Sequence, residues 1–289
     1  MSKLSRSSAR RIDLVLKTCI ASLAALYALF PAAWVISAAM DPSNSLASQS
    51  LIPRQPTLAN FQRLVNDPHH PFVLWLWNSL KISAISAVII VALTALAAYS
   101  FSRFRYRGRR TGLLAILLVQ LFPNTLAMVA LFFLLQQIGK VIPWLGLNTH
   151  GGLILIYSGG GLGFSTWLMK GYFDSVPRDL DESALIDGAG RFQVFRHIIL
   201  PLVRPILAVI GILSFIGTYS DFLLPRVMLK SSANYTLALG MTLFIRGQYT
   251  REWGVFAAAA LMGALPIVLI FLLLQSQLIG GLTRGGVKG

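Results

Sequence analysis

The 289-residue sequence predicts an all-α membrane protein, a bundle of six transmembrane helices with both termini in the cytoplasm. Its composition indicates the class: 55% of the residues are hydrophobic, 12% are charged and the mean hydropathy is +0.68. Soluble domains carry about 25% charged residues, so this chain has roughly half of that share. The lengths of its apolar stretches and the placement of its basic residues predict the number of helices and their orientation.

Six apolar stretches are long enough to cross a bilayer, which takes about 20 residues of α-helix. They cover residues 18–40, 80–101, 112–136, 152–172, 204–225 and 254–276. They are too long and too uniformly apolar for barrel strands, and only helices or closed barrels satisfy backbone polar groups in lipid. The basic start also resembles a secretory signal, but its apolar run is longer than a signal core and its candidate cleavage site lies near residue 39. We therefore expect an uncleaved first span.

The basic residues indicate the orientation. With the N-terminus in the cytoplasm, 17 of the 25 Lys and Arg residues fall in cytoplasmic segments, as the positive-inside rule requires. A net charge of +15 could also suggest nucleic acid, but such binding needs a soluble basic face, so we expect membrane lipid and no nucleic acid. The predicted parts are a cytoplasmic segment (1–17), the first span with a periplasmic loop (18–79), a core of five spans (80–276) that includes a cytoplasmic loop at about 173–203, and a cytoplasmic tail (277–289).

The cytoplasmic loop reads as two short helices joined by a turn. Asp179 followed by Glu182 is a capping-box pattern, and Gly188 permits a sharp turn. Apolar residues of the second helix then recur at helical spacing: Phe192, Phe195 and Ile199. The apolar face has no evident partner within the chain, so the loop either lies on the membrane surface or docks on another protein.

This loop resembles the EAA loop of ABC importer permeases. The matching residues are Glu182, Ser183, Ala184, Gly188, Ile198, Leu200 and Pro201. Ser183 stands where alanine is usual, a change between small residues. From about residue 70 onward, stretches such as "GLNTHGGLILIY", "NYTLALGM" and "GLTRGGVKG" are similar to the MalG-type permease family of maltose/maltodextrin ABC importers.

The resemblance implies a six-helix ABC importer permease in the bacterial inner membrane, which works with a larger MalF-like permease, two ATPase subunits and a periplasmic sugar-binding protein. ATP and Mg are then bound by the ATPase, and this chain binds no cofactor or metal. It is not an enzyme by itself, and no phosphate-binding loop of the GxxxxGK[ST] type is present. A glycine-rich run at 159–164 indicates close helix packing or a loosened fourth span.

The resemblance also assigns three contact regions. The EAA loop is expected to dock on the ATPase, and its amphipathic pattern, rather than the resemblance, suggests Phe192 and Phe195 as the apolar anchors. The tail reaches between the ATPase subunits through Thr283, Arg284, Gly285, Gly286, Val287, Lys288 and Gly289. A periplasmic segment made of Gly247, Gln248, Tyr249 and Thr250 reaches the sugar cleft of the binding protein.

Other interpretations stay open at this point. Four acidic residues of the loop, Asp179, Asp181, Glu182 and Asp187, could suggest a Mg²⁺ site, but helix capping and partner contact explain them better because no second acidic cluster accompanies them. A secondary transporter would bury ionisable residues in mid-membrane, and Asp221 is the only carboxylate of the later spans. Asp221 either lines the pathway or gate or is simply solvated at a helix end. The sugar could also be another oligosaccharide, such as trehalose. The single Cys19 is expected to be a small buried hydrophobe.

Overall fold

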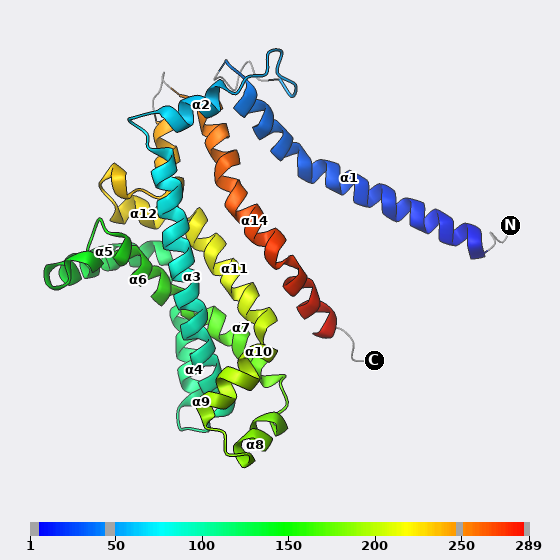
Figure 1. The fold of residues 1–289 in the computed structure, drawn as a ribbon, viewed down its shortest axis with the longest axis vertical. Coiled ribbons are helices and arrows are strands. Elements are labelled where there is room, and N and C mark those ends of the chain that lie inside the picture. Colours follow the sequence, from blue (N-terminus) through cyan, green and yellow to red (C-terminus); the bar gives the residue numbers. More distant parts are fainter. Residues whose placement is uncertain (1–5, 44–49, 247–250, 286–289) are drawn as a thin grey trace. The chain divides into compact units, whose positions relative to one another are not determined.

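The computed structural model describes residues 6–43, 50–246 and 251–285, and this part of the chain contains helices and no strand. The chain divides into two compact units. One consists of residues 1–69 with 241–262, and the other of residues 70–240 with 263–289. Each unit is described by itself below, with the helices labelled as in Figure 1.

The first unit contains two helices, α1 (Arg6–Met40) and α2 (Ala59–Asn66), together with a short 3₁₀ helix (Thr242–Ile245) and the start of α14. The buried Asn60 side chain joins α2 to the end of α1, since its Nδ2 donates to the carbonyls of Ala39 (3.0 Å) and Asp41 (2.9 Å). Most of α1 is exposed, and none of its most apolar 18-residue window is buried. Cys19 is exposed with it, so the prediction that Cys19 is buried is wrong for this chain alone.

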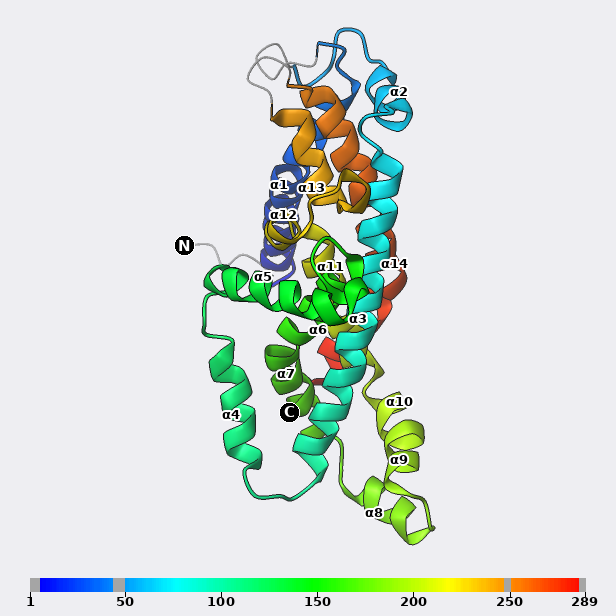
Figure 2. The same ribbon diagram turned by 90° about the vertical axis from the view of Figure 1, so that its left-hand side faces the viewer.

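The second unit is organised around α3 (Phe72–Arg103), which packs along α6, α7 and α11 (Figures 1 and 2). Its other helices are α4 (Arg109–Val119), α5 (Asn124–Val141), α6 (His150–Gly160), α7 (Leu162–Asp174), α8 (Asp179–Ile186), α9 (Arg191–Gln193), α10 (Leu200–Leu202), α11 (Arg204–Ser220), α12 (Leu223–Met228) and α13 (Leu237–Met241), and it includes the greater part of α14 (Trp253–Gly285). Short 3₁₀ helices lie at Pro143–Leu145 and Ser232–Asn234, and a π-helix lies at Val194–Ile199.

Two of the predicted spans are interrupted. The third, expected over 112–136, divides into α4 and α5 at Pro123, which lacks an N–H and disfavours helical backbone in the residue before it. The fourth, expected over 152–172, bends by 47° between α6 and α7. Within the described residues, three helices are long and apolar enough to cross a membrane, or up to five if each bent pair is one span.

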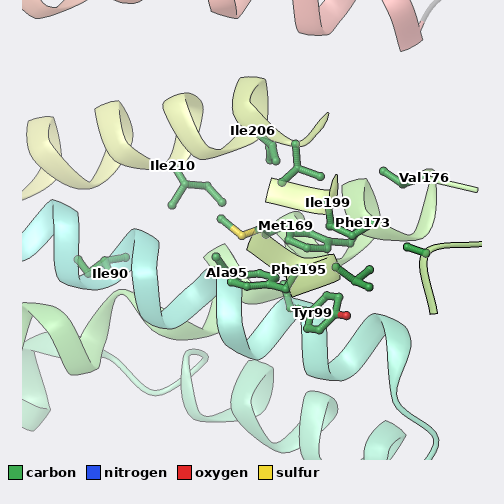
Figure 3. Close-up of a cluster of buried hydrophobic side chains, with 14 residues drawn as sticks. Ile90, Ala95, Tyr99, Met169, Phe173, Val176, Phe195, Ile199, Ile206 and Ile210 are labelled. Atoms are coloured by element: carbon green, nitrogen blue, oxygen red, sulfur yellow. The ribbon is translucent and has the colours of Figure 1, made fainter. Parts of the chain in front are cut away.

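The interior of the second unit has two apolar clusters. One lies toward the C-terminal half of α3 and gathers residues of α3, α7, the segment 194–203 and α11 (Figure 3). The other gathers buried side chains of α3, α5, α6, α12 and α13: Ile82, Leu135, Leu153, Leu224, Met228, Leu229 and Leu239.

The segment after α11 is folded rather than a plain connector. Asn148 holds it from the start of α6, with its Oδ1 accepting from the backbone N–H groups of Lys230 and Ser231, both at 2.9 Å. The Nε1 of Trp75 in α3 donates to the carbonyl of Ser232 at 2.8 Å. Residues 230–232 of this segment are therefore held by α3 and by the residue just before the N-cap of α6.

Candidate functional site

The loop between α7 and α11 is a helix–turn–helix, as the sequence predicts (Figure 2). Helix α8 ends at Ile186, the turn follows, and α9 continues through the π-helix and α10. Gly188 has φ +85°, a left-handed conformation that side chains rarely adopt, and a Cβ added there would meet no atom within 4 Å. The glycine is therefore required by backbone conformation and not by crowding.

The predicted capping box at the start of α8 is wrong. Asp179 is the first residue of the helix, Arg178 occupies the N-cap position, and no side-chain cap hydrogen bond is formed there. A side-chain cap does occur at the next helix, where Gln193 Oε1 accepts from the Gly190 N–H at 2.7 Å. The acidic first turn of α8 still favours the helix, because negative charge is stabilising at a helix N-terminus.

Phe195 is not available as an anchor for a partner protein. Its side chain is 6% exposed and packs in the chain's own core, with its ring centroid 4.9 Å from that of Tyr99 in α3 (Figure 3). Ile199, one π-helical turn later, is fully buried. Phe192 is 65% exposed. The loop thus has an intrachain partner, contrary to expectation, and only one of the two predicted phenylalanine anchors remains accessible.

Replacing Phe195 by alanine should therefore act on stability. Removal of a buried phenylalanine ring costs about 3–5 kcal/mol of unfolding free energy, whereas Phe192→Ala removes an exposed ring and should cost far less. Thermal unfolding of the two purified variants in detergent measures the difference. Equal losses of stability would contradict the assignment of Phe195 to the core.

The remaining EAA-loop residues divide between an exposed and a buried side. Glu182, Ser183 and Gly188 are exposed, Ala184 is buried, and Ile198, Leu200 and Pro201 are half-buried. An exposed apolar side chain that the sequence reading missed, Ile186, is 86% exposed beside the turn. We call Glu182, Ser183, Ile186, Gly188 and Phe192 the docking face, after the partner contact that is predicted for them; this face combines apolar area with one carboxylate. Ile186 could have been found from its position at the end of the helix, directly before the turn at Gly188.

One of the four acidic residues, Asp181, does not belong with the other three. It is 9% exposed, and its Oδ2 lies 2.5 Å from Nε of Arg103, the last residue of α3. Burial raises the pKa of the Asp181 carboxyl, while Arg103 and Arg178 oppose the shift. Asp181 therefore forms an internal ion pair, whereas the sequence analysis had expected helix capping or contact with a partner. Among the described residues, no group of His, Cys, Asp and Glu could hold a metal ion.

Asp221 lies between α11 and α12, where its carboxylate is hydrogen-bonded and faces a cavity. Its Oδ1 accepts from the Leu223 N–H at the start of α12 (2.9 Å), and its Oδ2 accepts from the Tyr157 hydroxyl of α6 (2.8 Å). The same carboxylate lines a cavity of about 570 Å³ between α5, α6 and α11. Ser214 and Thr218 lie on one face of α11, and Asp221, the residue after its end, lines this cavity with them.

The break between α6 and α7 forms another wall of this cavity, which Gly159, Gly160 and Gly161 line. The Gln120 side chain bridges the break, because its Nε2 donates to the Gly160 carbonyl (3.0 Å) and its Oε1 accepts from the Phe164 N–H (3.1 Å). A side-chain amide thus satisfies backbone groups that a break exposes in an apolar environment. The prediction of a loosened fourth span is confirmed by the bend between α6 and α7. A polar Gln120 inside an apolar stretch was a further sign of this break that the sequence analysis did not use.

The other predicted contact regions lie wholly or partly outside the described residues. Two segments of these regions lie outside the described residues. The first is the predicted binding-protein contact, Gly247, Gln248, Tyr249 and Thr250, and the second is the end of the tail, Gly286, Val287, Lys288 and Gly289. Thr283, Arg284 and Gly285 form the last residues of α14. Their assigned contacts stay predictions.

Comparison of this fold with solved structures finds ABC importers. A chain of a bacterial ABC transporter involved in the import of the acidic polysaccharide alginate matches with a TM-score of 0.77 and 22% identity, over 96% of this chain and 99% of that chain. A chain of the MetNI methionine ABC transporter, in inward-facing conformations, matches with a TM-score of 0.56 and 15% identity, over 72% of this chain and 95% of that chain. At these identities the likeness supports the fold.

Curated relatives are far more similar in sequence. Proteins named maltose/maltodextrin transport system permease protein MalG are 44% identical in Vibrio vulnificus (strain YJ016) and 43% identical in Escherichia coli (strain K12), each over 272 residues that make up 90% of this chain and 91% of the relative. Residues 90–278 match the model of a family described as the binding-protein-dependent transport system inner membrane component. With helices that are apolar enough to lie in a membrane and this match over most of its length, the chain belongs to the family of binding-protein-dependent transport system inner membrane components.

Proposed function

We propose that this chain is the permease subunit of an ATP-driven importer that carries maltose and maltodextrins across the bacterial inner membrane. The observation that carries the proposal is the 43–45% identity to MalG permeases over 90% of the chain. The exposed docking face supports it, because a permease needs a surface for a separate ATPase chain, which binds the ATP and Mg. The complex then contains a MalF-like second permease, two ATPase subunits and a periplasmic sugar-binding protein.

The topology that goes with this function has six spans and two cytoplasmic termini. The spans are α1, α3, α4 with α5, α6 with α7, α11, and α14. The arginines in the segment between α3 and α4 and those of the loop between α7 and α11 then lie on one side, as the positive-inside rule requires. Transport follows from alternating access, in which closure of the ATPase dimer moves the docked loop and exchanges two packings of the bundle.

Reconstitution tests the function directly. The chain, co-expressed with its second permease and ATPase, is placed in liposomes with sugar-loaded binding protein outside. Uptake of labelled maltotriose that depends on ATP is the expected result, with trehalose as the competing sugar. Uptake of trehalose without maltotriose would keep the permease function and change its substrate, whereas uptake that is independent of ATP would indicate a secondary transporter.

Asp221 is proposed to line the sugar pathway at the cavity between α5, α6 and α11. Support comes from its position in the cavity lining and from its hydrogen bond with the Tyr157 hydroxyl, since carboxylates and hydroxyls are groups that exchange hydrogen bonds with sugar hydroxyls. Asp221→Asn keeps an acceptor for the Leu223 N–H but removes the charge. We expect transport to fall about tenfold, the equivalent of roughly 1.4 kcal/mol, with assembly unchanged. Tyr157→Phe is the companion variant, and wild-type uptake in both would leave Asp221 a helix cap alone.

The C-terminal tail is proposed to contact the ATPase subunits. Five of the ten residues in "GGLTRGGVKG" are glycine, so ordering the tail costs much backbone entropy and needs a partner to offset it. Deletion of residues 283–289 should lower sugar-stimulated ATP hydrolysis and leave membrane insertion intact. Replacement of Arg284 and Lys288 by glutamine in the full-length tail is the matched control for charge alone. Unchanged stimulation after the deletion would show that the tail is idle.

A further inference from the structure

The loop between α7 and α11 (residues 175–203), called the coupling loop from here on, is held at several points by the last turn of α3. Arg103 Nη2 donates to the carbonyl of Val176 (2.9 Å), and its Nε pairs with Asp181 (2.5 Å). In return, Arg178 Nη2 donates to the carbonyl of Ser102 at 3.1 Å. The two side chains of the ion pair are 5% and 12% exposed, so water screens them little.

The same turn also holds the ends of the loop. Before α8, the Ser102 hydroxyl donates to Asp174 Oδ1 at the end of α7 (2.6 Å). After the Gly188 turn, the Tyr99 hydroxyl donates to the carbonyl of Arg191 (3.2 Å), and the Tyr99 ring packs on Phe195. Both helices of the loop are therefore attached to the end of a helix that lies 72 to 92 residues earlier in the sequence.

We propose that the last turn of α3 is the element that receives the movement of the docked loop, and that Arg103 and Asp181 are its positioning pair. This rests on the proposed function, because the movement comes from ATPase closure. The pair holds α8 at a fixed position on α3, so that α8 and α3 move together. Charge-assisted bonds in a buried site are short and geometrically restrictive, which suits them to transmit a displacement.

The path from this turn leads to the cavity. Helix α3 packs along α6, α7 and α11, and its Ile90 lines the cavity together with Gly161 of the broken span and Asp221 at the end of α11. A displacement at Arg103 is transmitted along a single continuous helix to Ile90, since both residues lie within Phe72–Arg103. The route to the sugar thus runs through the second predicted span rather than only through the two helices adjacent to the loop in sequence.

Four forms of the complex test this proposal: wild type, Asp181→Asn, the apolar double variant Arg103→Met with Asp181→Leu, and the control Asp179→Asn. Asp179 is an exposed carboxylate on the same helix, two residues from Asp181. The double variant removes the pair without leaving a buried uncompensated charge, a replacement that is often neutral for stability. Each complex is reconstituted, and the retained ATPase, the basal hydrolysis and the ratio of sugar-stimulated to basal hydrolysis are measured.

We expect Asp181→Asn and the double variant to retain the ATPase while the stimulation ratio falls at least tenfold, and Asp179→Asn to match wild type. A wild-type ratio in Asp181→Asn would overturn the proposal. Recovery of the stimulation ratio in the double variant would also overturn the proposal, and so would failure of both variants to assemble. Either result would assign the ion pair to folding alone. A wild-type complex that no sugar-loaded binding protein stimulates would instead refute the proposed function.

Discussion

Replacement of Gly188 by aspartate should release the ATPase from the permease or uncouple ATP hydrolysis from transport. The residue lies at the exposed turn of the coupling loop, and a side chain there meets nothing within 4 Å in this chain. Beyond the backbone strain that a side chain meets at this positive φ, an effect must arise at the surface of a partner, where aspartate brings both a Cβ and an unpaired charge into a contact. We expect co-purified ATPase or transport to fall at least tenfold, because an uncompensated charge at a desolvated contact costs more than about 1.4 kcal/mol.

Two controls separate this effect from backbone strain. Asparagine and aspartate adopt the left-handed conformation more readily than other side chains, so Gly188→Asn retains the turn without the charge and should be milder. Gly108, which also has φ +85° and open space around it, is the matched position in the segment between α3 and α4. Gly108→Asp should keep the ATPase. Wild-type co-purification and transport in Gly188→Asp would refute docking at this turn.

Exchange of Gly247–Thr250 for a Gly/Ser linker of equal length should abolish most sugar uptake while the complex still assembles. The natural residues suit contact with a sugar cleft: Gly247 permits close approach of the backbone, Gln248 and Thr250 can hydrogen-bond hydroxyls, and Tyr249 presents a flat face with a polar end. A linker keeps the length and the backbone freedom of glycine and removes the side chains of Gln248, Tyr249 and Thr250. We expect at least a tenfold loss of uptake at saturating binding protein.

The yield of assembled complex is read beside that uptake. The same linker placed at residues 44–47, in the first predicted periplasmic loop, is the matched control and should leave uptake near that of wild type. Normal uptake with the linker at 247–250 would make that segment a connector. Loss of assembly together with uptake would instead give it a structural role.

The helical class followed from the sequence because apolar length and charge placement are properties of single stretches. The divisions within the spans were harder to predict. Pro123 lies in a run that is apolar on both sides, so hydropathy alone joined α4 to α5. At the fourth span the glycines predicted a loosened helix. The side chain that hydrogen-bonds across the break is Gln120, which lies 40 residues before Gly160 in the sequence. A contact between residues so far apart in the sequence depends on how the helices pack, so it cannot be predicted from the local sequence pattern.

The coupling loop shows the same limit on the scale of single side chains. Its turn at Gly188 and its two helices followed from local chemistry. The burial of Phe195 and the exposure of Phe192 could not be predicted in this way, since both residues lie three or four positions from apolar neighbours. The position of Tyr99 in α3 decides which of the two rings is covered. Likewise, Asp181 and Asp179 are equivalent in sequence, and the end of α3 makes one of them an internal partner and leaves the other in solvent.

The π-helix at Val194–Ile199 has a consequence for the register of the whole loop. A π-turn holds one residue more than an α-turn, so this segment carries the equivalent of a single-residue insertion between the docking face and α11. Deleting one residue there would allow regular α-helical bonding and would improve the local backbone. It would also rotate everything before it by about 100°, the angle of one helical residue, and carry Phe195 away from Tyr99. The loop is therefore a place where chain length, and not only side-chain identity, is under constraint, and a relative that is one residue shorter here must turn its docking face in another direction.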